Sequence, residues 1–144
     1  MIGLVYRAAD ALRRRLLRND HGRIGEDLAH RYLRRKGCTI VARRYRPRAG
    51  GGEIDVVAWD RGTLAFVEVK TRESTEFGAP ERAVDEEKKI YLARAGRDYA
   101  RRANVPWDQV RFDILSVILG DPPEIEWLRD AFRARGWETR AAGN

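Results

Sequence analysis

The sequence predicts one α/β domain with a mixed β-sheet, in the order helix, three strands, helix, two strands. Apolar residues recur at helical spacing in the longer segments and alternate or run together in the shorter ones. A long predicted helix separates two strand-like segments, which favours a parallel pair joined by a right-handed crossover. The length of 144 residues suffices for one well-buried core.

The first segments of the chain are predicted helices. Residues 4–18 form a basic amphipathic helix, with apolar positions four residues apart and arginines clustered near its end. A nucleic-acid arm, a membrane-surface helix and a loosely packed extension all fit this pattern. A second helix is predicted at 22–36, and Gly37 stands where a helix is expected to end.

The remaining segments are strands and loops around one long helix. The loop at 47–52 contains three consecutive glycines, and a second loop is expected at 72–81. A helix is predicted at 82–103, and the tail after 136 is expected to fray. The strands are predicted at 38–46, 53–59, 64–71, 110–118 and 124–128.

Cysteine content and hydropathy exclude several classes of protein. Cys38 is the one cysteine, so an intramolecular disulfide and a cysteine-rich zinc site are excluded, and we expect a small buried hydrophobe. The longest apolar runs are too short to span a bilayer. The first residues do not have the pattern of a signal peptide. These features predict a cytoplasmic protein.

The positive charge is concentrated in the N-terminal third. The formal net charge is +7, but residues 1–48 carry a net charge of +10 and residues 49–144 carry −3. Polyanions such as DNA, RNA or an acidic membrane surface are the natural partners of such a segment. An arginine-rich composition that only aids solubility is the alternative, since Arg outnumbers Lys 25 to 4.

Charged residues stand inside two of the predicted strands. Asp55 lies in the first, and Glu68 and Lys70 lie in the second. A strand interior disfavours a charge unless the charge is paired or binds a metal. If Arg61-Gly62 forms a two-residue hairpin turn, Asp55 stands directly opposite Glu68, with Cβ atoms roughly 4.5–5.5 Å apart.

The opposed carboxylates predict a metal site. Two carboxylates at that spacing repel each other unless a cation lies between them, and their oxygens suit Mg²⁺ or Mn²⁺. Asp55 and Glu68 are therefore candidate metal ligands. A three-residue loop would shift the register and turn Glu68 to the other face, and Arg61 is not a favoured residue in the shorter turn. Ion pairs with arginine are the alternative role for both acids.

Further charged residues are candidates for the same site. Lys70 could orient or activate a water molecule, because a desolvated lysine can lose its proton. Glu26, at the edge of the apolar stripe of the second helix, is a third acid unless it only compensates the helix dipole. Lys88 interrupts the apolar stripe of the long helix, where a lysine that extends its ammonium group into solvent is the alternative. Glu53 is the acid for which pairing with an arginine is most favoured.

Five motifs stand in order along the chain. They are Gly22-x-x-Gly25-Glu26-x-x-Ala29, Gly52-Glu53-Ile54-Asp55, Phe66-Val67-Glu68-Val69-Lys70-Thr71-Arg72, Arg111-Phe112-Asp113 and Glu126-Trp127-Leu128-Arg129-Asp130-Ala131-Phe132. Together they resemble the YraN family of small bacterial proteins, which is related to Holliday-junction resolvases and looks like part of the PD-(D/E)XK nuclease superfamily. Arg44 departs from the pattern, because the family usually has Asn at this position.

The resemblance implies a restriction-endonuclease-like core of three α/β/α layers at residues 20–132. Residues 1–19 would then be a basic extension and residues 133–144 a tail. By motif, Asp55 and Glu68 would be the metal-ligating acids, Lys70 the lysine near the attacking water and Glu26 the helix glutamate of resolvase-like members. The expected nucleic-acid contacts are Arg43, Arg44, Arg46, Arg48, Arg72 and Lys88.

The expected function is that of a metal-dependent endonuclease that hydrolyses phosphodiester bonds in DNA, with a preference for particular DNA structures. Mg²⁺ or Mn²⁺ is the expected cofactor, and kinship with resolvases favours a homodimer. Two alternatives stay open. One is a nucleic-acid-binding module of nuclease fold with little catalytic power, and the other is a scaffold whose basic helix docks to a membrane or a protein.

Overall fold

The computed structural model describes residues 20–73 and 86–133. The predicted basic helix at 4–18 lies outside this part of the chain. The described elements are a helix at residues 20–35, called the N-terminal helix below, and then β1 (Thr39–Tyr45), β2 (Ile54–Asp60), β3 (Thr63–Arg72), α2 (Glu86–Arg102), a short 3₁₀ turn (Trp107–Gln109), β4 (Val110–Ile118) and β5 (Glu124–Phe132). The predicted order of helices and strands is confirmed.

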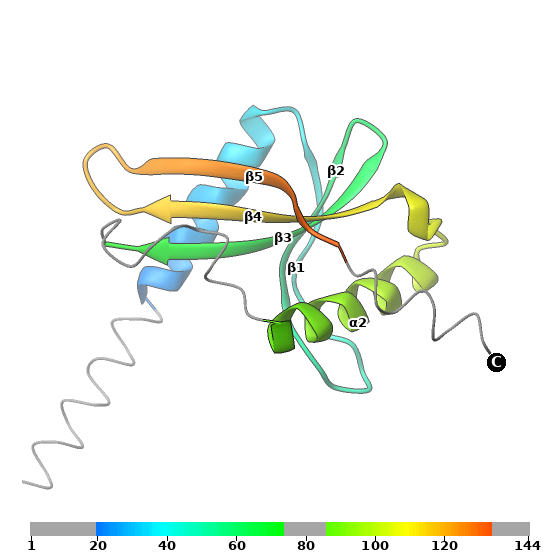
Figure 1. The fold of residues 1–144 in the computed structure, drawn as a ribbon. Helices are drawn as coiled ribbons and strands as arrows, with labels where there is room; N and C mark the ends of the chain where they lie inside the picture. Colours follow the sequence, from blue (N-terminus) through cyan, green and yellow to red (C-terminus); the bar gives the residue numbers. More distant parts are fainter. Residues whose placement is uncertain (1–19, 74–85, 134–144) are drawn as a thin grey trace, which may run out of the picture.

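The five strands form one mixed sheet in the order β1-β2-β3-β4-β5. The pairs β1–β2, β2–β3 and β4–β5 are antiparallel, whereas β3 and β4 are parallel. A parallel pair cannot be joined by a tight turn, and α2 is the helix that stands between β3 and β4 in the sequence. Figure 1 shows the N-terminal helix and α2 on opposite faces of this sheet. Within the described residues, no helix is long and apolar enough to cross a membrane.

The β2–β3 hairpin has the predicted register. Asp60 pairs with Thr63, and the pairing continues to Val56 and Val67. Both turn residues have positive φ, 49° at Arg61 and 88° at Gly62, as in the primed turns that match the twist of the flanking strands. Arg61 thus adopts a conformation that the sequence alone disfavours, because the strands on both sides fix the turn.

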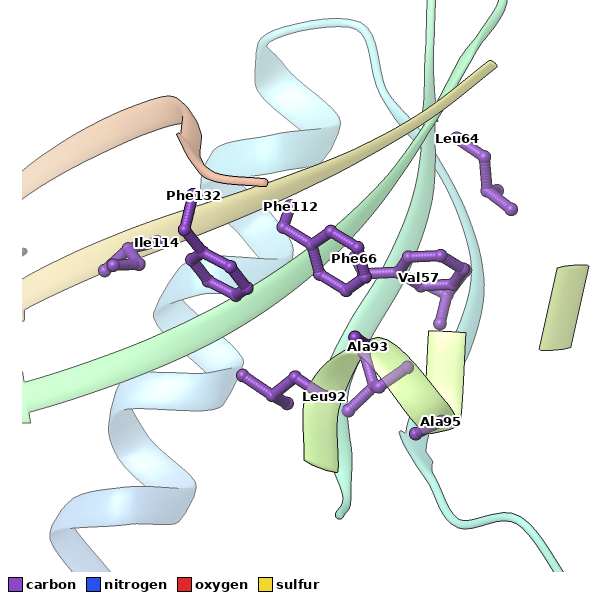
Figure 2. Packing of buried hydrophobic residues seen from close by; sticks show 10 residues of the cluster. Val57, Leu64, Phe66, Leu92, Ala93, Ala95, Phe112, Ile114 and Phe132 are labelled. Atoms are coloured by element: carbon purple, nitrogen blue, oxygen red, sulfur yellow. The ribbon is translucent and has the colours of Figure 1, made fainter. Parts of the chain in front are cut away.

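The face of the sheet under α2 carries an aromatic core. Phe66 and Phe112 lie 5.3 Å apart between ring centroids, and Phe132 stacks on Phe112 at 5.1 Å. Leu92, Ala93 and Ala95 of α2 belong to the same cluster of buried residues, and Figure 2 shows them facing these rings. Gly96 lets the helix come this close, since a Cβ there would lie 2.9 Å from both Phe66 and Phe112.

The N-terminal helix covers the other face through Ala29 and Leu33, which are fully buried in a second cluster that also holds Cys38. Gly37, with φ of 94°, ends this helix as predicted, and the Cys38 N–H donates to the Leu33 carbonyl at 3.0 Å. Closer to the helix start, Gly25 packs directly on β3. A Cβ at Gly25 would stand 1.8 Å from Thr71 Oγ1.

A buried carboxylate ties β4 to β5. Asp113 is 0% exposed and accepts two hydrogen bonds from the Arg111 guanidinium, at 2.7 and 2.8 Å. The Trp127 indole N–H and the Asp130 backbone N–H complete its shell, at 3.0 and 2.9 Å. Four donors compensate the desolvation of this charge.

The last strand is longer than predicted, because it continues past residue 128 to Phe132. The register of β4 and β5 shifts between Phe112 and Ile114, and Asp130 adopts a φ of 53°. This irregularity returns β5 to the sheet and places Phe132 in the aromatic core. The sequence pattern of β5 alone could not predict this extension, because the contacts that stabilise it come from β4.

The close approach at Gly25 is testable by a pair of alanine substitutions in one helix. Gly25→Ala is expected to lower the free energy of unfolding by about 1–3 kcal/mol, because the methyl group would overlap Thr71. Gly22→Ala is the matched control, since a Cβ there has nothing within 4 Å. It should leave stability unchanged or raise it by up to about 1 kcal/mol. Equal effects in urea denaturation would contradict this packing.

The Asp113 network predicts a large cost for neutralising a buried charge. Asp113→Asn should lower the free energy of unfolding by about 3–5 kcal/mol, because Arg111 would keep only Asp60 as an anionic partner and one amide N–H₂ would face donors. Asp108→Asn, at an exposed position of the 3₁₀ turn, should change it by no more than about 0.5 kcal/mol. Chemical denaturation of both variants is the measurement.

Candidate functional site

The site lies where β2 and β3 part. The β2–β3 pairing ends at Val56 and Val67. Beyond this point β2 stays paired to β1 as far as Ile54, while β3 stays paired to β4 as far as Arg72. Figure 1 shows the β1–β2 pair turning away from β3. The fork between the two halves of the sheet is open to side chains from both helices.

Asp55 stands at the base of this fork. Its Oδ2 accepts a hydrogen bond from the Val69 N–H at 2.8 Å. The pairing stops one residue before Asp55 and Glu68, so the predicted direct opposition of their backbones is not formed. The reason is that the Asp55 carboxylate takes over the β3 N–H that a backbone carbonyl would otherwise bind.

The carboxyl group of Asp55 is difficult to ionise. Burial, together with the charges of Glu68 and Glu26, raises its pKa from the ordinary 3.8 to about 7. The Val69 N–H and the positive charge of Lys88 only partly oppose these effects. The electrostatic influence of Glu68 on Asp55 agrees with the prediction that these two acids share one site.

Glu68 is buried and held by two lysines. It is 5% exposed, and its Oε1 lies 2.6 Å from Lys88 Nζ and 3.5 Å from Lys70 Nζ. Within the described part of the chain, its Oε2 atom is buried and has no hydrogen-bond partner. A buried oxygen without a donor is costly, and a bound cation or water would satisfy it.

The two lysines differ in proton affinity. Burial lowers the pKa of Lys70, and neighbouring Lys88 lowers it further. Burial alone would lower the pKa of Lys88 as well, but its contacts with Glu68 and Lys70 outweigh this and raise it. Lys88 is thus the ion-pair partner of Glu68, and Lys70 is the lysine that loses its proton more readily. The alternative of a solvent-extended Lys88 does not describe this contact.

Asp55 also forms a group of three acids with Glu26 and Glu53. Ligand oxygens of Glu26, Glu53 and Asp55 all lie within 4.8 Å of one another. They come from the N-terminal helix, the segment before β2 and β2 itself. Such a set of carboxylates fits Mg²⁺ or Mn²⁺, and the unsatisfied Glu68 oxygen supports the same fit. Glu68 itself is turned toward the lysines and is not a member of this group.

Arginines from β1 and the residue after it neutralise the outer acids of this triad. Arg44 Nε donates to Glu26 Oε2 at 2.7 Å, and Arg46 donates to Glu53 Oε2 at 2.6 Å. Arg43 bonds Asp27 at 2.9 Å and lies 3.6 Å from Glu26. The predicted alternative of pairing with arginine therefore describes Glu53 in this structure, and Glu26, for which it was not predicted, pairs with arginine as well.

The backbone of Arg44 is unusual for an arginine. Its φ is 52°, a left-handed conformation that Asn adopts more readily than a long side chain. The asparagine that the resembled family usually has at this position suits the same backbone. The departure thus exchanges a conformationally favoured residue for one that reaches Glu26.

Arg48 and Arg72 are the remaining predicted nucleic-acid contacts. Arg48 is exposed in the loop before β2, and Arg72 is half-buried at the end of β3. Sequence reasoning missed Glu53 as a member of the acidic group. The signal was its place in Gly52-Glu53-Ile54-Asp55, beside a glycine that packs on α2. A Cβ at Gly52 would stand 3.0 Å from the Cβ of Tyr91.

Comparisons with known proteins give one consistent result. The model of the family described as "Uncharacterised protein family UPF0102" matches residues 25–117. A UPF0102 protein of Solibacter usitatus is 70% identical over 92% of this chain and 100% of its own length. UPF0102 proteins of Koribacter versatilis and Desulfosudis oleivorans are 44% and 38% identical, over 80% and 81% of this chain and 80% and 93% of their own lengths.

The raised pKa of Asp55 predicts how stability depends on pH without divalent metal. The folded protein holds the Asp55 proton up to about pH 7, and the unfolded chain releases it near pH 3.8. This contribution to stability is therefore complete below pH 3.8 and is lost as the pH rises through 7. Asp55→Asn should be increasingly more stable than the parent protein as the pH rises from 4.5 to 8.

The measurement is urea denaturation of both proteins in EDTA across this range. Asn retains the oxygen that accepts the Val69 N–H, so only the titration is removed. A stability difference that is constant with pH would contradict the assignment.

Proposed function

This chain belongs to the uncharacterised protein family UPF0102, and we propose that it is a metal-dependent endonuclease that hydrolyses phosphodiester bonds in DNA. One observation carries the proposal. Glu26, Glu53, Asp55 and Glu68 converge with two lysines at the fork between β2 and β3. Asp55 has a pKa near 7, and Glu68 nearby has a buried oxygen without a hydrogen-bond partner. Such perturbed groups are typical of functional sites, and a purely structural role for these acids does not require them.

The acids supply the ligands for a divalent ion. Glu26, Glu53 and Asp55 would hold Mg²⁺ or Mn²⁺, and the neighbouring Glu68 has a buried Oε2 without a hydrogen-bond partner. When bound, such an ion polarises a phosphoryl oxygen and makes a bound water more acidic. The ion would compensate the negative charges of Glu68 and Glu26, which act together with burial to raise the pKa of Asp55.

The two lysines have different roles near the reacting phosphate. Lys70, whose pKa is lowered, is suited to orient the attacking water or to accept its proton. Lys88 fixes Glu68 through the 2.6 Å contact with Oε1 and leaves Oε2 for another partner. The excess of positive charge in residues 1–48 would attract the phosphate backbone without reading its sequence.

The resemblance to the YraN family and to PD-(D/E)XK nucleases supports the proposal. It assigns Asp55 to the metal and Lys70 to the attacking water, as the proposal does, and it adds Glu68 as a second metal ligand. A cytoplasmic location and a homodimer, as in resolvases, belong to this proposal as well. Branched DNA is the substrate to examine first.

A second candidate function is nucleic-acid binding without catalysis. Arg44, Arg46 and Lys88 give Glu26, Glu53 and Glu68 each a cationic partner. Three of the four acids are therefore neutralised without any metal. A protein that only binds DNA would keep this balance.

Cleavage assays separate the two functions. The full chain is incubated with branched and linear DNA in Mg²⁺, in Mn²⁺ and in EDTA. Metal-dependent cleavage should fall by about 10²-fold or more in Asp55→Asn, Glu68→Gln and Lys70→Met, the scale expected for losing one contact to the transition state. Arg101→Gln, at an exposed position in the last turn of α2, is the control that should retain activity.

DNA binding is measured on the same proteins by fluorescence anisotropy. DNA binding with no cleavage in either metal would support the second function and end the first. Cleavage that persists in Asp55→Asn and Glu68→Gln would show that another site is responsible.

A further inference from the structure

We propose that Arg44 and Arg46 are exchangeable counterions, which hold the acidic group until a divalent ion binds and then bind phosphates of the nucleic acid. The inference rests on the proposed function and describes how its two ligands are coupled. It predicts that metal and DNA bind cooperatively.

Both arginines can leave their acids at low cost. The side chains of Arg44 and Arg46 are 46% and 77% exposed, whereas those of Glu26 and Glu53 are 15% and 27% exposed. The acids are thus held by the fold, and the arginines extend to them from the rim. Ion pairs this accessible contribute little to stability.

A divalent ion and these arginines would compete for the same two carboxylates, those of Glu26 and Glu53. The guanidinium groups lie 2.7 Å from Glu26 Oε2 and 2.6 Å from Glu53 Oε2. A metal ion would bind these carboxylates at about 2.0–2.2 Å. It would add two positive charges beside the two already present, so electrostatic repulsion favours departure of the arginines.

A basic cavity lies beside Arg44, one of the two arginines. It has a volume of about 400 Å³ and is lined by Arg23, Asp27, Arg43 and Arg44. Three of these four residues are arginines, and Arg23 is exposed on the N-terminal helix. Guanidinium groups bind phosphate oxygens with paired hydrogen bonds. A backbone phosphate near this cavity would therefore give Arg44 a new anionic partner.

The exchange links the two ligands in both directions. Metal binding makes the arginines available to phosphate, and phosphate binding removes the competitors of the metal. Any such coupling must be reciprocal, because it is a single free energy shared between the two sites. DNA should raise the affinity for metal by the same factor as metal raises the affinity for DNA.

The first test is the affinity for Mn²⁺ alone, measured by calorimetry on the full chain. Arg44→Asn removes the charge and suits the positive φ at this position. Arg46→Gln removes the charge that faces Glu53. Each should bind Mn²⁺ about two- to fivefold more tightly than the parent protein, as expected for loss of a part-exposed ion pair. Arg44→Lys and Arg101→Gln should leave the affinity unchanged.

The second test measures coupling without cleavage, in the Glu68→Gln background. Duplex DNA should raise the affinity for Mn²⁺, and Arg44→Asn with Arg46→Gln should abolish this increase. Circular dichroism and thermal denaturation establish that each variant is folded. Parent-like or weaker Mn²⁺ binding in both arginine variants would overturn the inference.

The outcomes separate this inference from the proposed function. If no protein of the series binds Mn²⁺, both fail. If DNA is cleaved, but the arginine variants bind Mn²⁺ no more tightly than the parent protein and DNA raises their affinity for Mn²⁺ as much as it does in the parent, the exchange is overturned and the nuclease stands. If the coupling requires the arginines and no DNA is cleaved, the exchange stands and the nuclease fails.

Discussion

The parting of β2 from β3 after Val56 and Val67 is the constraint on which the candidate site depends. In a continuous ladder, Asp55 and Glu68 would be ordinary cross-strand neighbours on one face. Because the strands separate, the Asp55 carboxylate binds the Val69 N–H, and side chains from both faces of the sheet can meet. Glu26 arrives from the N-terminal helix and Lys88 from α2.

Close packing holds the two helices at the fork. Gly25 lets the N-terminal helix touch Thr71 of β3, and Gly52 lets the segment before β2 touch Tyr91 of α2. Each glycine stands next to an acid of the site, Glu26 or Glu53. The glycines that allow this close packing therefore also place the neighbouring carboxylates at the site. On the other half of the sheet, the Asp113 carboxylate accepts hydrogen bonds from Arg111, Trp127 and the Asp130 backbone, and it thereby joins β4 to β5.

The charges of the site are balanced by residues of different mobility. Lys88 contacts the buried Glu68, whereas the arginines reach the outer acids from exposed positions. Loss of Lys88 would be costly on the side of Glu68, because the carboxylate, with a side chain 6% exposed, would lose its closest cation while still desolvated. An exposed pair can exchange partners at little cost. This gradient of exposure gives the inner charges a fixed arrangement and leaves the outer ones adjustable.

The sequence by itself determined the order of elements, the hairpin register and the strands that carry Asp55, Glu68 and Lys70, since these follow from local periodicity and one short turn. Only the tertiary structure decided that Glu53 joins Glu26, that Arg44 and Arg46 face acids and that β5 reaches Phe132. The physical reason is the same in each case. These contacts join segments far apart in the chain or follow a break in strand pairing, and periodicity carries no information about either.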